Sequence, residues 1–91
     1  DVEKRKVTVR ENRVELSPKE FELLNLLASR PGKSYSRQQI LNLVWGYDFD
    51  GYEHTVNSHI NRLRGKIEPD IAKPQYILTT WGIGYRFNED L

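Results

Sequence analysis

The sequence contains no cysteine and no methionine, and it lacks a long hydrophobic run. The absence of cysteine excludes a disulfide framework and any thiolate metal site, and it fits a reducing compartment. No apolar stretch approaches the roughly 18 residues of a membrane span, and the N-terminus has no signal-peptide pattern. Because the chain begins with Asp1 rather than methionine, we expect a segment of a longer, soluble protein without a membrane partner.

The composition is that of a small globular domain with balanced charge. The chain has 91 residues, of which 37% are hydrophobic and 11% aromatic, which suffices for one compact domain and little more. Lys and Arg number 14 against 13 Asp and Glu, so the net charge is +1. Strong nucleic-acid binders are usually basic overall, so the distribution of charge matters more here than its sum.

Two β-hairpins are predicted, one near each end of the chain. Residues 6–10 and 13–16 alternate apolar and polar side chains and are expected to form short strands joined at residues 11–12. Residues 75–80 and 84–87 are expected to form a second pair of strands. The glycines between that pair permit a tight reversal of the chain.

Two helix starts carry a capping-box signature. Ser17 is followed three residues later by Glu20, and Ser36 is followed three residues later by Gln39. The first helix is expected to stop at the Arg-Pro-Gly sequence that follows its apolar residues. The second is expected over 36–45.

A third helix is predicted over 54–67, after a loop at 46–53. Its apolar residues recur at intervals of four, three and four, so they share one face. The predicted order is therefore a hairpin, three helices and a second hairpin. A third helix followed by a hairpin is the outline of a winged helix, so we expect an α+β fold and one domain over 1–91.

The third helix has an extensive polar side. Opposite its apolar stripe lie His54, Ser58, Asn61 and Gly65, flanked by Thr55, Asn57 and Arg62, with His59, Arg64 and Lys66 nearer the stripe. Such side chains suit base edges and phosphates. No Asp or Glu occurs between positions 54 and 67, although acidic residues are common on solvated faces, so the pattern favours an anionic partner. An ordinary solvated face is the alternative.

The second hairpin offers further candidate contacts. Trp81 is predicted at its tip beside Gly82, where its ring either packs back onto the domain or inserts at a nucleic-acid groove. Tyr85 and Arg86 follow, and either could reach a phosphate. Strand alternation puts these two on opposite faces, so at most one is well placed.

Metal and catalytic sites are not indicated. Aligning Gly51 with the invariant glycine of a calcium loop puts Gly46 at the first ligand position. His54 and His59 are five residues apart rather than the helical four, and no third zinc ligand is evident. No nucleophile-elbow or phosphate-loop motif occurs. We therefore expect no metal, no cofactor and no enzymatic activity.

Three stretches in order carry a resemblance to a known family. They are LSPKEFELLNLLASRPGKSYSRQQILNLVWG, HTVNSHINRLRGKIE and YILTTWGIGYRF, and they fall within roughly residues 13–88. Together they resemble the C-terminal DNA-binding domain of OmpR/PhoB-type response regulators. Any one stretch alone would be a weak signal, but the ordered combination is specific.

The resemblance implies a bacterial, cytoplasmic transcription factor controlled by a sensor kinase through a receiver domain that is absent here. It implies dimers of the full-length protein on direct repeats of double-stranded DNA. The third helix would enter the major groove and the second hairpin, the wing, would reach the neighbouring minor groove. Contact with RNA polymerase would fall to the loop residues Tyr47, Asp48, Phe49, Asp50, Gly51, Tyr52 and Glu53.

The resemblance also implies individual roles. Thr55, His59, Tyr85 and Trp45 match phosphate contacts of the family, and Arg62 and Arg64 match its two conspicuous arginines. We predict base contacts by His54, Ser58, Asn61 and Arg62, phosphate contacts by Trp45, Thr55, His59, Arg64, Lys66 and Tyr85, and wing contacts by Trp81, Gly82 and Arg86.

Several positions depart from the family pattern. Asn57 stands where aspartate is usual, and Trp81 where arginine is common. Some members carry arginine at the positions of Asn61 and His54. The family's N-terminal sheet has about four strands, and this chain has room for two or three. The alternative reading is a winged-helix protein-interaction module that does not touch DNA, which the near-neutral charge and the aromatic loop favour.

Overall fold

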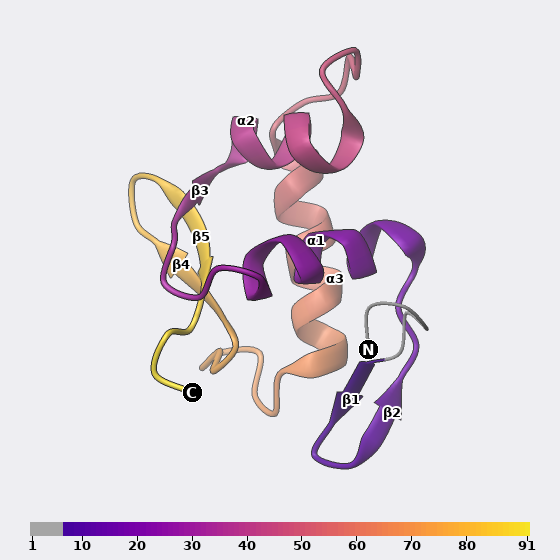
Figure 1. Cartoon of the computed structure of the whole chain (residues 1–91), viewed down its shortest axis with the longest axis vertical. Coiled ribbons are helices and arrows are strands. Elements are labelled where there is room, and N and C mark those ends of the chain that lie inside the picture. Colours follow the sequence, from indigo (N-terminus) through magenta and orange to yellow (C-terminus); the bar gives the residue numbers. More distant parts are fainter. Residues whose placement is uncertain (1–6) are drawn as a thin grey trace.

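The computed structural model describes residues 7–91 and contains two small sheets and a set of helices (Figure 1). The order along the chain is β1 (Val7–Val9), β2 (Asn12–Val14), α1 (Pro18–Ala28), β3 (Tyr35–Ser36), α2 (Arg37–Ile40), η1 (Leu41–Trp45), α3 (His54–Ile67), β4 (Ile77–Thr80) and β5 (Gly84–Phe87). The predicted α+β winged helix is confirmed, with β4 and β5 as the wing.

The N-terminal hairpin has a tighter turn than the sequence predicted. Val7 pairs with Val14, and the reversal uses Arg10 and Glu11, whose φ angles are +50° and +68°. Two positive φ angles in a two-residue loop match the right-handed twist of the flanking strands. The predicted turn at 11–12 is therefore wrong by one residue. Position 6 of the predicted first strand lies outside the described residues.

The capping boxes at both predicted helix starts are confirmed. The Ser17 hydroxyl accepts from the Glu20 N–H at 3.2 Å, and the Ser17 N–H donates to the Glu20 carboxylate at 2.8 Å. The same reciprocal pair joins Ser36 and Gln39. The single helix predicted over 36–45 is not uniform, because its second half is the wider turn η1.

The sheet of the wing contains a strand that the sequence did not predict. That strand is β3. The strand order of the sheet is β3-β5-β4, and Tyr35 of β3 pairs with Tyr85 of β5. β4 begins two residues later than predicted. The Glu68 carboxylate accepts the backbone N–H groups of Gln75, Tyr76 and Ile77, and so holds the entry to this strand against the end of α3.

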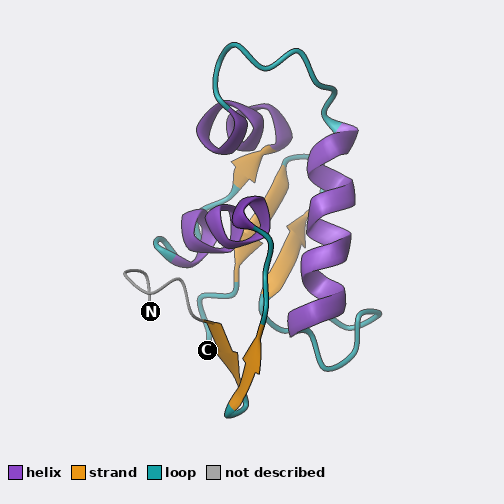
Figure 2. Ribbon diagram, turned by 90° about the vertical axis from the view of Figure 1, so that its right-hand side faces the viewer, coloured by secondary structure: helices purple, strands orange, loops and turns teal. Residues whose placement is uncertain are grey.

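The core lies where α1, α2 and η1 meet the inner face of α3 and the wing sheet (Figure 2). The stripe of α3 is wholly inside it, since Val56, Ile60 and Leu63 are each 0% exposed. This burial fixes which side of α3 faces outward. The predicted bounds of this helix, 54–67, are confirmed.

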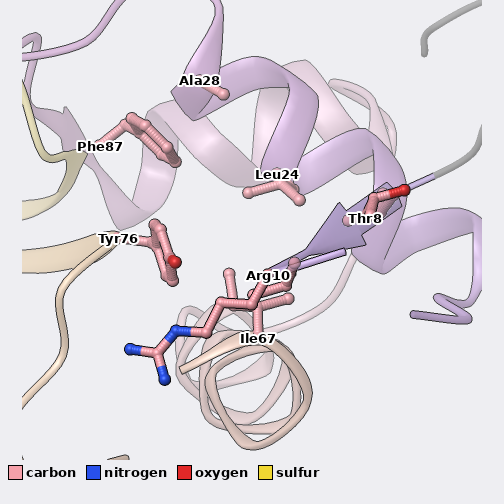
Figure 3. A pocket seen from close by; sticks show the side chains of 9 residues that line it. Thr8, Arg10, Leu24, Ala28, Ile67, Tyr76 and Phe87 are labelled. Atoms are coloured by element: carbon pink, nitrogen blue, oxygen red, sulfur yellow. The ribbon is translucent and has the colours of Figure 1, made fainter. Parts of the chain in front are cut away.

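An apolar cleft lies at the opposite end of the molecule from the 46–53 loop, between the N-terminal hairpin, α1 and the end of α3. It has a volume of about 230 Å³. Figure 3 shows Leu24, Ile67, Tyr76 and Phe87 around it. The cleft is separate from the exposed face of α3.

Candidate nucleic-acid interface

The outward face of α3 consists of the polar residues that the sequence pattern grouped together. His54, Ser58, Asn61, Arg62, Gly65 and Lys66 are exposed, and Thr55, Asn57 and His59 are half-buried. A Cβ added at Gly65 would meet no atom within 4 Å, so no packing inside the domain requires glycine there. The face contains no carboxylate, and it is open to a large partner.

The start of α3 is ordered by local contacts. The Tyr52 ring stacks on the His54 imidazole, with 5.5 Å between centroids and 15° between planes. The Ser58 hydroxyl donates to the His54 carbonyl at 3.2 Å. These contacts hold two predicted base-reading side chains on the first exposed turn.

Trp45 and His59 form an aromatic pair beside this face. Their rings meet edge to face with 4.9 Å between centroids, and His59 Nδ1 lies 2.9 Å from the Thr55 carbonyl. The structure thus brings together three predicted phosphate contacts. It adds Lys19, which the sequence reasoning missed: its Nζ lies 5.9 Å from the centre of the Trp45 ring and donates to the Val44 carbonyl at 2.9 Å.

Arg64 does not lie on the outward face. It is 9% exposed, and its guanidinium donates to the Ile77 carbonyl through Nε at 3.2 Å and Nη2 at 2.9 Å. Nη2 also donates to the Thr79 hydroxyl at 3.0 Å. Burial lowers the pKa of Arg64, against the opposing influence of Tyr85 and Glu68. This placement disagrees with the predicted phosphate contact, because the guanidinium fastens α3 to β4.

Lys66 is exposed but has a partner within the domain. Its Nζ lies 2.5 Å from the Glu20 carboxylate, which is buried at the start of α1. Burial alone would raise the pKa of Glu20, but the hydrogen bonds from Lys66 and from Ser17 outweigh it and lower that pKa. Lys66 therefore lies at the end of the outward face, tied to α1.

The tip of the wing is fully available. Trp81 is 89% exposed, so of the two readings left open by the sequence, packing back onto the domain is excluded in this structure. Gly82 has a φ of +80°, a conformation that favours glycine at the reversal. Arg86 is turned toward its own sheet, where it donates to the Thr79 carbonyl at 3.2 Å and the Thr80 hydroxyl at 3.0 Å.

A polar groove of about 370 Å³ runs between α3 and the wing. Its walls include Asn57 of α3, Arg37 at the start of α2, and residues 79–85. The Tyr85 hydroxyl donates to Asn57 Oδ1 across the groove at 2.7 Å. Arg37, which the sequence reasoning did not single out, pairs with Glu53 at 3.3 Å.

The 46–53 loop projects beyond the start of α3 (Figure 1). Tyr47 and Tyr52 are 80% and 74% exposed. The Phe49 ring is 42% exposed, and its centroid lies 6.0 Å from that of Trp45. It also lies so close to Gly51 that any Cβ there would overlap the ring. The loop therefore presents two tyrosines and three carboxylates next to the polar face.

Within residues 7–91, no three His, Asp or Glu side chains are close enough to share a metal ion. In the same part of the chain, no helix combines the length and the apolar character that crossing a membrane requires.

Comparison with known proteins places the chain. Residues 11–87 match the family described as transcriptional regulatory protein, C terminal. A probable transcriptional regulatory protein of Picosynechococcus is 50% identical over 82 residues, which cover 90% of this chain and 33% of the relative. The chain spans about a third of the length of the curated relatives it matches.

Two solved structures are similar over most of the chain. The response regulator DrrB of Thermotoga maritima, an OmpR/PhoB homologue, has a TM-score of 0.81 and 38% identity, over 87% of this chain and 36% of its own. The DNA-binding domain of Klebsiella pneumoniae RstA, solved in complex with the RstA box, has a TM-score of 0.86 and 32% identity, over 97% of this chain and 87% of its own. The chain thus belongs to the family of C-terminal DNA-binding domains of OmpR/PhoB-type response regulators.

Proposed function

We propose that this domain binds double-stranded DNA sequence-specifically, with α3 in the major groove and the β4–β5 wing at the neighbouring minor groove. The observation that carries this proposal is the outward face of α3, which is exposed, polar and free of carboxylates over its whole length. The similar RstA domain was solved bound to its DNA box. A single helix with such a face fits the width of the B-DNA major groove.

The groups on this face divide by their chemistry. Arg62, Asn61, Ser58 and His54 occupy the exposed ridge, and they are proposed to read base edges, with Arg62 suited to guanine and Asn61 to adenine. Beside this ridge lie Trp45, Thr55 and His59, which are proposed to contact phosphates. Lys66, at the C-terminal end of α3, is proposed to contact a phosphate. This contact would weaken its ion pair with Glu20.

The wing complements the helix. Trp81 and Gly82 form the exposed tip, and the tip is proposed to reach the minor groove. The indole ring is uncharged, so the negative potential of a narrow minor groove does not attract it as it attracts an arginine. The Trp81 ring is therefore proposed to act by contact with sugars or bases.

The partners of the full-length protein follow from the family. We infer RNA polymerase as a partner of the exposed 46–53 loop, a receiver domain addressed by a sensor kinase, and homodimers on direct repeats. We also infer a cytoplasmic site of action and no catalytic activity. The exposed tyrosines of the loop support a protein contact there in addition to DNA binding, rather than in place of it.

An NMR titration tests the proposal. The isotope-labelled domain is titrated first with a generic duplex and then with direct-repeat duplexes selected from a random pool. Shifts concentrated at residues 54–66 and 79–85, with tighter binding to the selected sequence, are expected. Affinity should fall steeply with salt, because several phosphates are neutralised. Absence of shifts in those segments at low salt would refute DNA binding and favour the protein-interaction module.

A further inference from the structure

Tyr85 joins the wing to two points on α3. Its hydroxyl donates to Asn57 Oδ1 at 2.7 Å, and the centre of its ring lies 5.4 Å from the Arg64 guanidinium carbon. Asn57 and Arg64 are two helical turns apart, roughly 10 Å along the axis. One side chain of the wing therefore contacts α3 at two points about two turns apart.

A further contact through β4 links Arg64 to Tyr85. Arg64 donates to the Thr79 hydroxyl at 3.0 Å, and Thr79 is the direct cross-strand partner of Tyr85. Turning the Tyr85 ring outward to a phosphate would break both its hydrogen bond and its stacking on Arg64. The ring is thus held against α3, and its hydroxyl proton is directed at Asn57.

This arrangement fixes the Asn57 amide. The Tyr85 hydroxyl occupies the carbonyl oxygen Oδ1, and Nδ2, which can only donate, has no hydrogen-bond partner among residues 7–91. Asn57 lies one turn from Asn61, so it borders the exposed ridge proposed to read bases. A freely rotating asparagine would offer both a donor and an acceptor.

We propose that Tyr85 is a positioning residue that locks the Asn57 amide, and that Asn57 is a specificity-determining residue that presents a hydrogen-bond donor to one base pair. This inference rests on the proposed function. A guanine edge holds two acceptors and no donor in the major groove, whereas cytosine presents its N4 donor there. Asn57 therefore favours guanine and rejects cytosine at its position.

The test is selection of duplexes from a random pool, followed by sequencing, for the wild-type domain and two variants. Asn57→Asp replaces the donor by a group that only accepts, so one base-pair position should reverse from guanine to cytosine by roughly 5- to 150-fold. Tyr85→Phe keeps the ring and removes only the hydroxyl. It should relax the same position toward adenine, because the released amide offers a donor and an acceptor together.

Matched controls separate this effect from charge and stability. Asn25→Asp adds the same charge on α1, and Tyr76→Phe removes a hydroxyl from the residue just before β4. Both should leave the preferred sequence unchanged. Equal weakening on every sequence by Asn57→Asp, or an unaltered preference in Tyr85→Phe, would overturn the inference. A wild-type domain that selects no sequence would overturn the proposed function, and this inference with it.

Discussion

The carboxylate of Glu20 binds the ammonium group of Lys66 with 2.5 Å between Oε1 and Nζ, and so ties the first turn of α1 to the last turn of α3. The same Oε1 accepts the Ser17 N–H at 2.8 Å, which closes the capping box. One buried oxygen therefore serves the start of one helix and the end of the proposed recognition helix. The protonation state of the Glu20 carboxylate therefore affects both the capping box of α1 and the ion pair with α3.

The pH dependence of stability follows from this pair. The pKa of Glu20 in the folded domain is below its ordinary value of 4.5, so the ionised form stabilises the fold above that pH, and this contribution is lost as the pH falls further. At neutral pH, Glu20→Gln should lower the free energy of unfolding by about 1–2 kcal/mol. Urea unfolding of both proteins between pH 7 and pH 3 should show the difference narrowing below about 4.5. A constant difference would mean that the carboxylate charge contributes nothing.

The two arginines of the RLR motif should behave oppositely. Arg64→Met removes three hydrogen bonds to β4, two of them buried, and should cost about 1.5–3 kcal/mol of stability. Arg62→Ala changes an exposed side chain and should leave unfolding within about 0.5 kcal/mol of the wild type. On a selected DNA sequence, Arg62→Ala should cost about 1–3 kcal/mol of binding if it grips a base.

Chemical denaturation and a paired titration on selected and random DNA measure these quantities. Equal weakening of Arg62→Ala on both duplexes would reassign Arg62 to a phosphate. An Arg64→Met domain as stable as the wild type would contradict the structural role assigned to Arg64.

The sequence was sufficient where the signals are local. A capping box involves residues three apart, so Ser17 with Glu20 was visible without a fold. The spacing of apolar residues gave the bounds of α3 for the same reason. Both signals come from residues three or four positions apart, which lie within about one turn of a helix.

The features that escaped prediction depend on partners distant in the chain. A helical wheel places Arg64 beside the apolar stripe but cannot show that Ile77 and Thr79 accept its hydrogen bonds. β3 has only two residues and exists because β5 pairs with it, so no local pattern reveals it. The resemblance assigns Tyr85 to a phosphate, and no local pattern shows that its hydroxyl donates to Asn57, which lies 28 positions away in the chain.

Contact with RNA polymerase should depend on the exposed tyrosines of the loop. Tyr47 is 80% exposed, and replacing it with serine removes an aromatic surface without disturbing the core. In the full-length protein, Tyr47→Ser should leave operator affinity unchanged and lower transcription in a reconstituted assay. Arg62→Ala is the matched control, since it should lose both together. Unchanged transcription with Tyr47→Ser would remove this residue from the polymerase contact.

Trp81 provides the sharpest test of the wing. It is 89% exposed, so neither Trp81→Ala nor Trp81→Arg should alter stability by more than about 0.5 kcal/mol. Trp81→Ala removes a contact that carries no charge, so DNA affinity should fall while its dependence on salt stays the same. Trp81→Arg adds a cation at the minor groove, so the slope of log affinity against log salt should steepen by about 0.9. Fluorescence anisotropy at several salt concentrations measures both effects. If neither variant changes affinity or slope, the wing tip does not reach DNA, and α3 alone contacts the duplex.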